Sequence, residues 1–69
     1  MDGSVFKLIE LTGTSSVSME DAVKRAIDEA AKTVRNMSWF QVVETRGSIK
    51  QNAVAEWQVT LKVGFKIES

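Results

Sequence analysis

The stretch A-E-W-Q-V-T-L-K-V-G-F-K-I-E, residues 55–68, alternates apolar and polar side chains without interruption. Such alternation is typical of a β-strand with one apolar and one polar face, because successive side chains point to opposite sides. At about 3.3 Å per residue, a strand of this length reaches roughly 46 Å. A compact chain of this size has a radius of gyration near ~11 Å. The strand is therefore expected to extend beyond what its own chain can cover.

A strand and a helix are predicted ahead of it, at residues 5–12 and 19–36. The first segment, V-F-K-L-I-E-L-T, is rich in β-branched and bulky apolar residues. In the second, apolar residues recur at intervals of three and four, which gives one helical stripe. Ser18 is expected to cap this helix, and Lys32 and Arg35 are expected to place positive charge in its last turn. The stripe is narrow and alanine-rich, so the helix cannot cover a long sheet alone.

A further long strand, residues 38–49, is expected to form an antiparallel hairpin with the strand of residues 55–68. A two-residue turn at Gln51 and Asn52 would join them, since Asn adopts positive φ readily. The predicted order is β-α-β-β, and the fold class is α+β. No internal repeat and no linker divides the chain, so we expect a single domain spanning residues 1–69, with residues 1–4 as a disordered tail.

The register of the hairpin decides which side chains share a face. With the two-residue turn, Trp39 is expected opposite Gly64, and Gln58 opposite Thr45. The same register points Arg46 into the apolar face, unless a bulge at this point of the strand turns it outward. Both Trp39 and Gln58 then belong to the polar face.

Composition limits both the core and the chemistry. A chain of 69 residues buries only about 60% of its unfolded surface, and one core of this size rarely supplies more than roughly 3–5 kcal/mol. The sequence has no Cys and no His, so disulfides, zinc sites and the usual nucleophile and base pairs are not expected. We therefore expect stabilisation by oligomerisation, no metal site, and a binding protein that is not an enzyme.

Net charge and targeting signals limit the classes of binding partner and the cellular location that we expect. Nine basic and nine acidic residues cancel, so no net field favours nucleic acid or an anionic membrane. No signal peptide and no apolar run of about eighteen residues is visible. A cytoplasmic location is the expectation.

Two polar-face residues are candidates for ligand binding, each with an ordinary alternative. Trp39 is either a core or interface tryptophan, or a stacking platform beside a flat slot left by Gly64. Gln58 is either a solvated strand residue, or a hydrogen-bonding partner for a heterocycle edge with carbonyl and N–H groups. Arg46 could bind a phosphate, although an ion pair with Glu44 or Glu56 is the commoner role. Because Trp39 and Gln58 would lie about 20 Å apart, a site that uses both needs two chains.

Three segments together resemble one family, the dodecins, which are small flavin-binding proteins of bacteria and archaea. They are V-F-K-L-I-E-L-T-G-T-S at residues 5–15, S-W-F-Q-V-V-E-T-R-G at 38–47, and W-Q-V-T-L-K-V-G-F at 57–65. The resemblance runs in order over nearly the whole chain. It implies a three-stranded antiparallel sheet wrapped around one helix, and twelve such protomers assembled into a hollow, tetrahedrally symmetric dodecamer.

The resemblance also implies a ligand and the residues that hold it. Flavins bind in antiparallel pairs in this family, which assigns stacking to Trp39 and a hydrogen bond to Gln58. In the bacterial branch the Arg of T-R-G reaches the flavin phosphate, here Arg46, while Glu44 and Thr45 lie near the ribityl chain. The implied ligand is FMN, with riboflavin or lumichrome as further candidates, and coenzyme A binds to some relatives. The implied function is storage, buffering and photoprotective quenching of the flavin. The alternative is an interaction module that uses the same hairpin for oligomerisation without a flavin.

Overall fold

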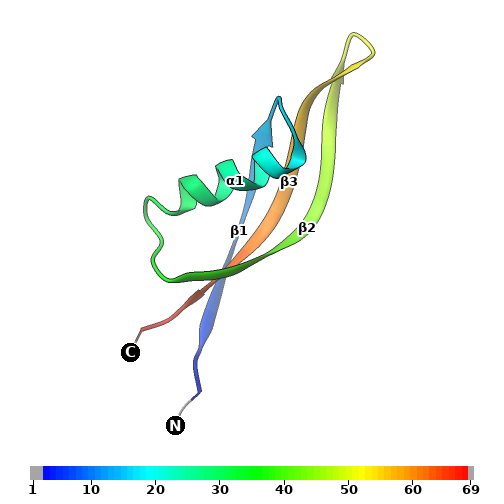
Figure 1. Cartoon of the computed structure of the whole chain (residues 1–69). Coiled ribbons are helices and arrows are strands. Elements are labelled where there is room, and N and C mark those ends of the chain that lie inside the picture. The colour runs from blue at the N-terminus through cyan, green and yellow to red at the C-terminus, as the bar shows by residue number, and fades with distance from the viewer. Residues whose placement is uncertain (1–2, 69) are drawn as a thin grey trace.

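The computed structural model describes residues 3–68 and contains three strands and one helix. These are β1 (Phe6–Ser15), α1 (Met19–Ala30), β2 (Met37–Lys50) and β3 (Ala53–Lys66). The strands form one antiparallel sheet in the order β1-β3-β2, with α1 on one side of it (Figure 1). The predicted β-α-β-β order and the α+β class are confirmed.

The core lies between α1 and the strands β1 and β3. Val59, Leu61 and Val63 of β3 are buried against Ala22 and Ala26 of the helix. The helix comes close because β1 has a glycine at this point. A Cβ atom on Gly13 would overlap the carbonyl oxygen of Ala22 and the side chain of Ala26. The alanine-rich stripe therefore packs tightly on two strands, and β2 extends beside them.

The start of α1 is held by side-chain hydrogen bonds. The Ser18 hydroxyl accepts a hydrogen bond from the backbone N–H of Asp21 (3.0 Å), which confirms the predicted cap. The buried Ser15 hydroxyl donates to the Asp21 carboxylate (2.6 Å), and the Arg25 Nε donates to it as well (2.7 Å). These bonds from Ser15 and Arg25 lower the pKa of Asp21 below its ordinary value, because they favour the charged form.

The helix ends at Ala30, earlier than the predicted residue 36. Residues 31–33 form a turn, in which the N–H of Thr33 donates to the carbonyl of Ala30 (3.1 Å), and Asn36 has a φ of 63°. Thr33 and Val34 are β-branched and form helices poorly, so the chain leaves the helix here. The prediction that Lys32 and Arg35 lie in the last helical turn is therefore wrong.

The hairpin of β2 and β3 is the longest feature of the molecule. Gln51 and Asn52 have φ values of 53° and 62°, which confirms the two-residue turn. The hairpin projects well past the helix (Figure 1), and the chain measures 56 × 20 × 13 Å, with a radius of gyration of 14.5 Å. Ile49 and Val54, beside the turn, are 72% and 55% exposed. As the alternation predicted, the hairpin extends beyond what its own chain covers.

The register agrees with the prediction beside the turn and again near Trp39, and differs in the middle of the hairpin. Trp39 lies opposite Gly64, as expected. The register shifts between Ser48 and Ile49 and shifts back between Val42 and Glu44, where Val43 is the extra residue, so Gln58 lies opposite Arg46 and not opposite Thr45. A residue added to one strand reverses the facing of those that follow, so this bulge turns Arg46 outward. In place of the single bulge predicted near Arg46 and Gly47, two irregularities lie on either side of them, at Val43 and between Ser48 and Ile49.

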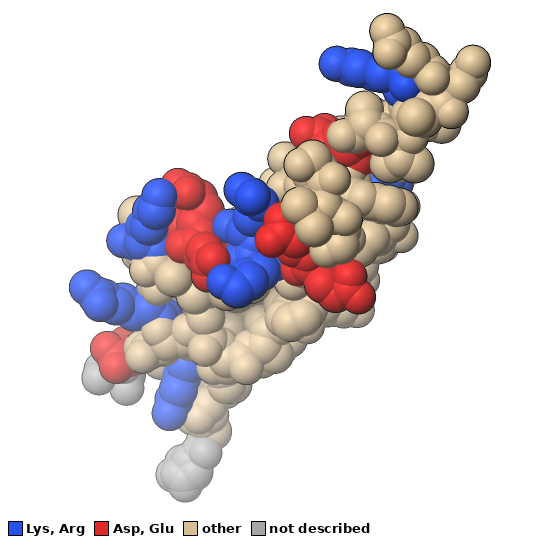
Figure 2. All heavy atoms as spheres, turned by 45° about the horizontal axis from the view of Figure 1, so that its top comes forward, with Lys and Arg blue, Asp and Glu red and all other residues tan. Residues whose placement is uncertain are grey.

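Charges of both signs are mixed on the surface. Figure 2 shows acidic and basic side chains side by side on the face that it presents, and side chains of both signs also lie on the projecting arm. Within residues 3–68 there is no helix with the length and apolar character that a membrane crossing requires. Met1 and Asp2 of the predicted tail lie outside the described residues, and Gly3 and Ser4 are exposed and precede β1.

Candidate functional site

The sheet has two faces, which we call the inner face, covered in part by α1, and the outer face, opposite to it. Gly13 and Val59 mark the inner face, since both pack on the helix. Alternation along the paired strands then assigns the outer face. It carries two groups of side chains, one around Trp39 and one around Gln58.

The Trp39 group is apolar and held by packing. The indole lies directly against the backbone of Gly64, where an added Cβ would overlap the ring atoms Cζ2, Cε2 and Cη2. Phe6 of β1 packs beside it, with the ring centroids 4.9 Å apart and the planes tilted by 58°. Trp39 is nevertheless 44% exposed. The space over Gly64, expected to be a slot for a ligand, is occupied by the indole itself, which keeps another part of its surface open.

The Gln58 group is polar and centred on Arg46. The Arg46 Nε donates to the Gln58 carbonyl oxygen Oε1 (2.8 Å), and Nη1 donates to the Glu44 carboxylate (2.9 Å) and, at 3.4 Å, to the Thr60 hydroxyl. These residues come together because the bulge at Val43 places Glu44 and Arg46 on the same face as Gln58. The predicted ion pair of Arg46 with Glu44 is confirmed.

A further carboxylate completes this network. The Gln58 amide nitrogen Nε2 donates to the Glu56 carboxylate (3.0 Å). Below them, the hydroxyls of Thr60 and Thr12 share a hydrogen bond of 2.8 Å, which joins β3 to β1. The cluster thus holds one guanidinium between an amide and a carboxylate, with a second carboxylate at the far end of the amide.

The chain matches the family model described as Dodecin over residues 5–68. It belongs to the dodecin family. A dodecin of Thermus thermophilus is 47% identical over 66 residues, which covers 96% of each chain. The solved structure of dodecin from Streptomyces coelicolor superimposes with a TM-score of 0.94 at 39% identity, covering 100% of this chain and 99% of that one. A calcium dodecin of Mycobacterium tuberculosis is 30% identical over 64 residues, covering 93% of this chain and 90% of that one.

Four of the five residues assigned to the site lie on the outer face of this dodecin. Glu44, Arg46 and Gln58 are joined by hydrogen bonds, and Trp39 lies on the same face, six positions along β3 from Gln58 when measured at Gly64. That spacing corresponds to roughly 20 Å. A single chain therefore does not bring Trp39 and Gln58 together.

Thr45 differs from the other four predicted site residues in the face that it occupies. Glu56 belongs to the hydrogen-bond network but was not among the predicted site residues. Thr45 lies opposite Val59, in register with the inner face, so it does not join the Arg46 network. From the sequence, Glu56 was expected only as an alternative to Glu44 in an ion pair with Arg46. A signal for Thr45 was present, because two successive valines, Val42 and Val43, break the alternation of β2 where the bulge occurs. A signal for Glu56 was its place two positions before Gln58, on the same face of the strand.

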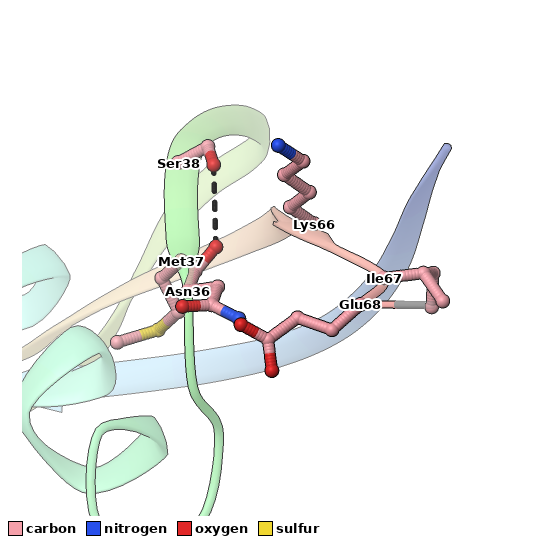
Figure 3. A pocket seen from close by; sticks show the side chains of 6 residues that line it. All are labelled: Asn36, Met37, Ser38, Lys66, Ile67 and Glu68. Atoms are coloured by element: carbon pink, nitrogen blue, oxygen red, sulfur yellow. Dashed lines mark hydrogen bonds between the residues drawn. The ribbon is translucent and has the colours of Figure 1, made fainter. Parts of the chain in front are cut away.

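A hollow on the surface of the chain lies apart from these residues. It has a volume of about 630 Å³ and opens where β2 begins and β3 ends (Figure 3). The Ser38 hydroxyl donates to the carbonyl oxygen of Asn36 at its edge (3.2 Å). Its lining is Asn36, Met37, Ser38, Lys66, Ile67 and Glu68. No group of three or more acidic side chains in the described part of the chain is arranged to hold a metal ion.

Proposed function

We propose that the protein binds a flavin, FMN or riboflavin, for storage, buffering and photoprotective quenching, and acts as a binding protein and not as an enzyme. The observation that carries this proposal is the half-exposed Trp39 indole, immobilised between Gly64 and Phe6 on the outer face. An exposed, immobilised aromatic ring is a suitable platform for a planar heterocycle. Membership of the dodecin family supports the choice of a flavin.

Stacking on Trp39 would supply the quenching as well as much of the affinity. The indole can give an electron to the photoexcited flavin at contact distance and take it back, so that the excitation is lost without further chemistry. The surroundings of Trp39 keep the ring in one place before the ligand arrives, which lowers the entropic cost of binding.

The polar cluster would recognise the edges of the ligand. The Gln58 amide suits the N–H and carbonyl edge of the isoalloxazine ring. Arg46 offers a charged contact to the FMN phosphate through Nη2, which makes no hydrogen bond within residues 3–68. Lumichrome and riboflavin lack the phosphate, so they would use Trp39 and Gln58 alone.

The same proposal includes assembly into a dodecamer, with each flavin site formed between chains. The distance between Trp39 and Gln58 in one protomer supports a shared site. The exposed apolar residues of the hairpin, including Phe40, Ile49 and Val54, support extensive contacts with other copies. Light scattering of the purified protein is expected to give the mass of twelve chains, and a folded monomer at micromolar concentration would contradict it.

The test of function is a titration of the flavin-free protein with FMN, riboflavin and lumichrome, followed by absorption and by flavin fluorescence. We expect saturable binding with strong quenching of the bound flavin. A protein that assembles but leaves the fluorescence of all three ligands unchanged would favour the alternative, an interaction module without a flavin. Repeating the titration with calcium and with a chelator tests whether a metal ion affects binding.

A further inference from the structure

The side-chain amide of Gln58 is held at both of its ends. Its Oε1 accepts from the Arg46 Nε (2.8 Å), and its Nε2 donates to the Glu56 carboxylate (3.0 Å). A guanidinium can only donate and an ionised carboxylate can only accept. A rotation that exchanged Oε1 with Nε2 would place donor against donor at Arg46 and acceptor against acceptor at Glu56. The amide therefore has one favoured orientation.

The two hydrogen bonds leave part of the hydrogen-bonding capacity of the amide free for a ligand. An amide has two N–H donors and two lone pairs on its oxygen. With one of each used, Gln58 retains one donor and one acceptor in a fixed order along the outer face. This remainder matches a heterocycle edge on which an N–H group lies next to a carbonyl group.

We propose that Glu56 is a positioning residue for ligand recognition, which holds the Gln58 amide so that it reads the N–H and carbonyl edge of a heterocyclic ligand. This inference rests on the proposed flavin binding and adds to it a residue that does not itself contact the ligand. Glu56 suits the task because it is next but one to Gln58 on β3, so both side chains lie on the same face.

The test compares riboflavin with N3-methylriboflavin, in which a methyl group replaces the ring N–H. The readout is the ratio of their dissociation constants, measured by fluorescence titration. Loss of one neutral hydrogen bond should make the unmodified protein prefer riboflavin by about three- to tenfold. Gln58→Ala should bring this ratio close to one, and Glu56→Ala should lower it part of the way, because Arg46 still holds the other end of the amide. Glu10→Ala is the matched control, because Glu10 is an exposed carboxylate of β1 opposite Lys62 on the outer face, and it should leave the ratio unchanged.

Two conservative variants separate positioning from charge. Glu56→Gln keeps an oxygen acceptor at the same reach and should restore most of the preference. Glu56→Asp keeps the charge but shortens the side chain, so it should not restore it. If Glu56→Asp restores the preference and Glu56→Gln does not, Glu56 acts through its charge and the positioning role is wrong.

The remaining outcomes distinguish this inference from the proposed function. If the unmodified protein binds riboflavin and prefers it over the methylated form, but Glu56→Ala keeps that preference, the inference is overturned while flavin binding stands. If riboflavin binds without any preference, Gln58 does not read the ring edge, and the inference is again wrong. If neither compound binds, the proposed function fails together with it.

Discussion

The two faces of the sheet are built from the same strands but are held together in different ways. On the inner face, Val59, Leu61 and Val63 are buried under α1, and close packing is the only interaction available to them. On the outer face, Arg46 and Gln58 form hydrogen bonds, and Trp39 is held by Gly64 and Phe6 while remaining accessible. Neighbouring residues of β3 therefore contribute alternately to stability and to the candidate site.

Because side chains alternate between the faces, the position of a residue along β3 predicts whether its substitution alters stability or ligand binding. Inner-face changes should alter the free energy of unfolding, and outer-face changes should alter ligand affinity. On β2 the rule reverses at the bulge at Val43, which is why Arg46 is an outer-face residue. The following substitutions test this separation of roles.

The largest effect is expected from Leu61→Ala, which removes a fully buried side chain from the inner face. Truncation of a buried leucine costs about 2–5 kcal/mol of stability, from lost burial and from the cavity that is left. The neighbouring outer-face change Lys62→Ala should stay within about 0.5 kcal/mol. Urea unfolding at equal chain concentration measures both, and equal losses for the two variants would break the comparison.

Trp39→Ala should lower flavin affinity by roughly 2–4 kcal/mol and leave assembly intact, because an outer-face stacking surface is lost. Trp57→Ala is the matched control, since Trp57 lies opposite Gly47 and Ser15 in register with the inner face. It should weaken the fold or its contacts before it affects the ligand. Flavin quenching and oligomer mass are measured for each. If Trp39→Ala dissociates the oligomer and bound flavin stays fully quenched, the roles of the two tryptophans are wrong.

Arg46→Ala should weaken FMN by about ten- to a hundredfold, since a charged hydrogen bond contributes roughly 1.5–3 kcal/mol. Riboflavin, which has no phosphate, should change far less. Calorimetric or fluorescence titration with both ligands measures the difference. An equal loss for both would show that Arg46 acts through its contacts with Gln58 and Glu44 and not through the phosphate.

Gly64→Ala sharpens the comparison with a single methyl group on the outer face. The new Cβ would overlap the Trp39 indole, so the ring must leave its place against the backbone. Because Trp39 is half exposed, it can move at little cost in stability, but the platform beside Phe6 is lost. We expect about a tenfold loss of flavin affinity, together with a changed near-ultraviolet circular dichroism band of Trp39. An unchanged band would show that the indole is not held by Gly64.

The smallest effect is expected from acid, through Asp21 at the start of α1. Its pKa is lowered in the folded protein by the hydrogen bonds from Ser15 and Arg25. A lowered pKa contributes stability above the ordinary value of about 3.9, and that contribution is lost as the pH falls from there through the folded value. Asp21→Asn should flatten the acid limb of the stability curve, measured by thermal unfolding between about pH 5 and pH 2. An unchanged limb would exclude this contribution.

Several features of the candidate site followed directly from the sequence. The alternation of residues 55–68 placed Trp57, Val59 and Leu61 on one face and Gln58 on the other, and the turn at Gln51 and Asn52 set the pairing of the strand ends beside it. The predicted pairing of Trp39 with Gly64 holds because the two register shifts that lie between it and the turn cancel. These features are local, because the facing of a strand residue and the register near a tight turn depend on neighbouring residues. The assignment of Trp39 and Gln58 to the outer face came from this pattern alone.

What the sequence by itself determined is thus the number, type and order of the elements and the facing of the long strand, since each follows from short-range periodicity. The tertiary structure alone decided where the helix ends, which of two adjacent valines becomes the bulge, and that Arg46 and Glu56 hold the Gln58 amide between them. These outcomes depend on how β2 fits against β3 and how α1 fits over Gly13. Such fits are settled by contacts between residues far apart in the chain, which no local pattern specifies.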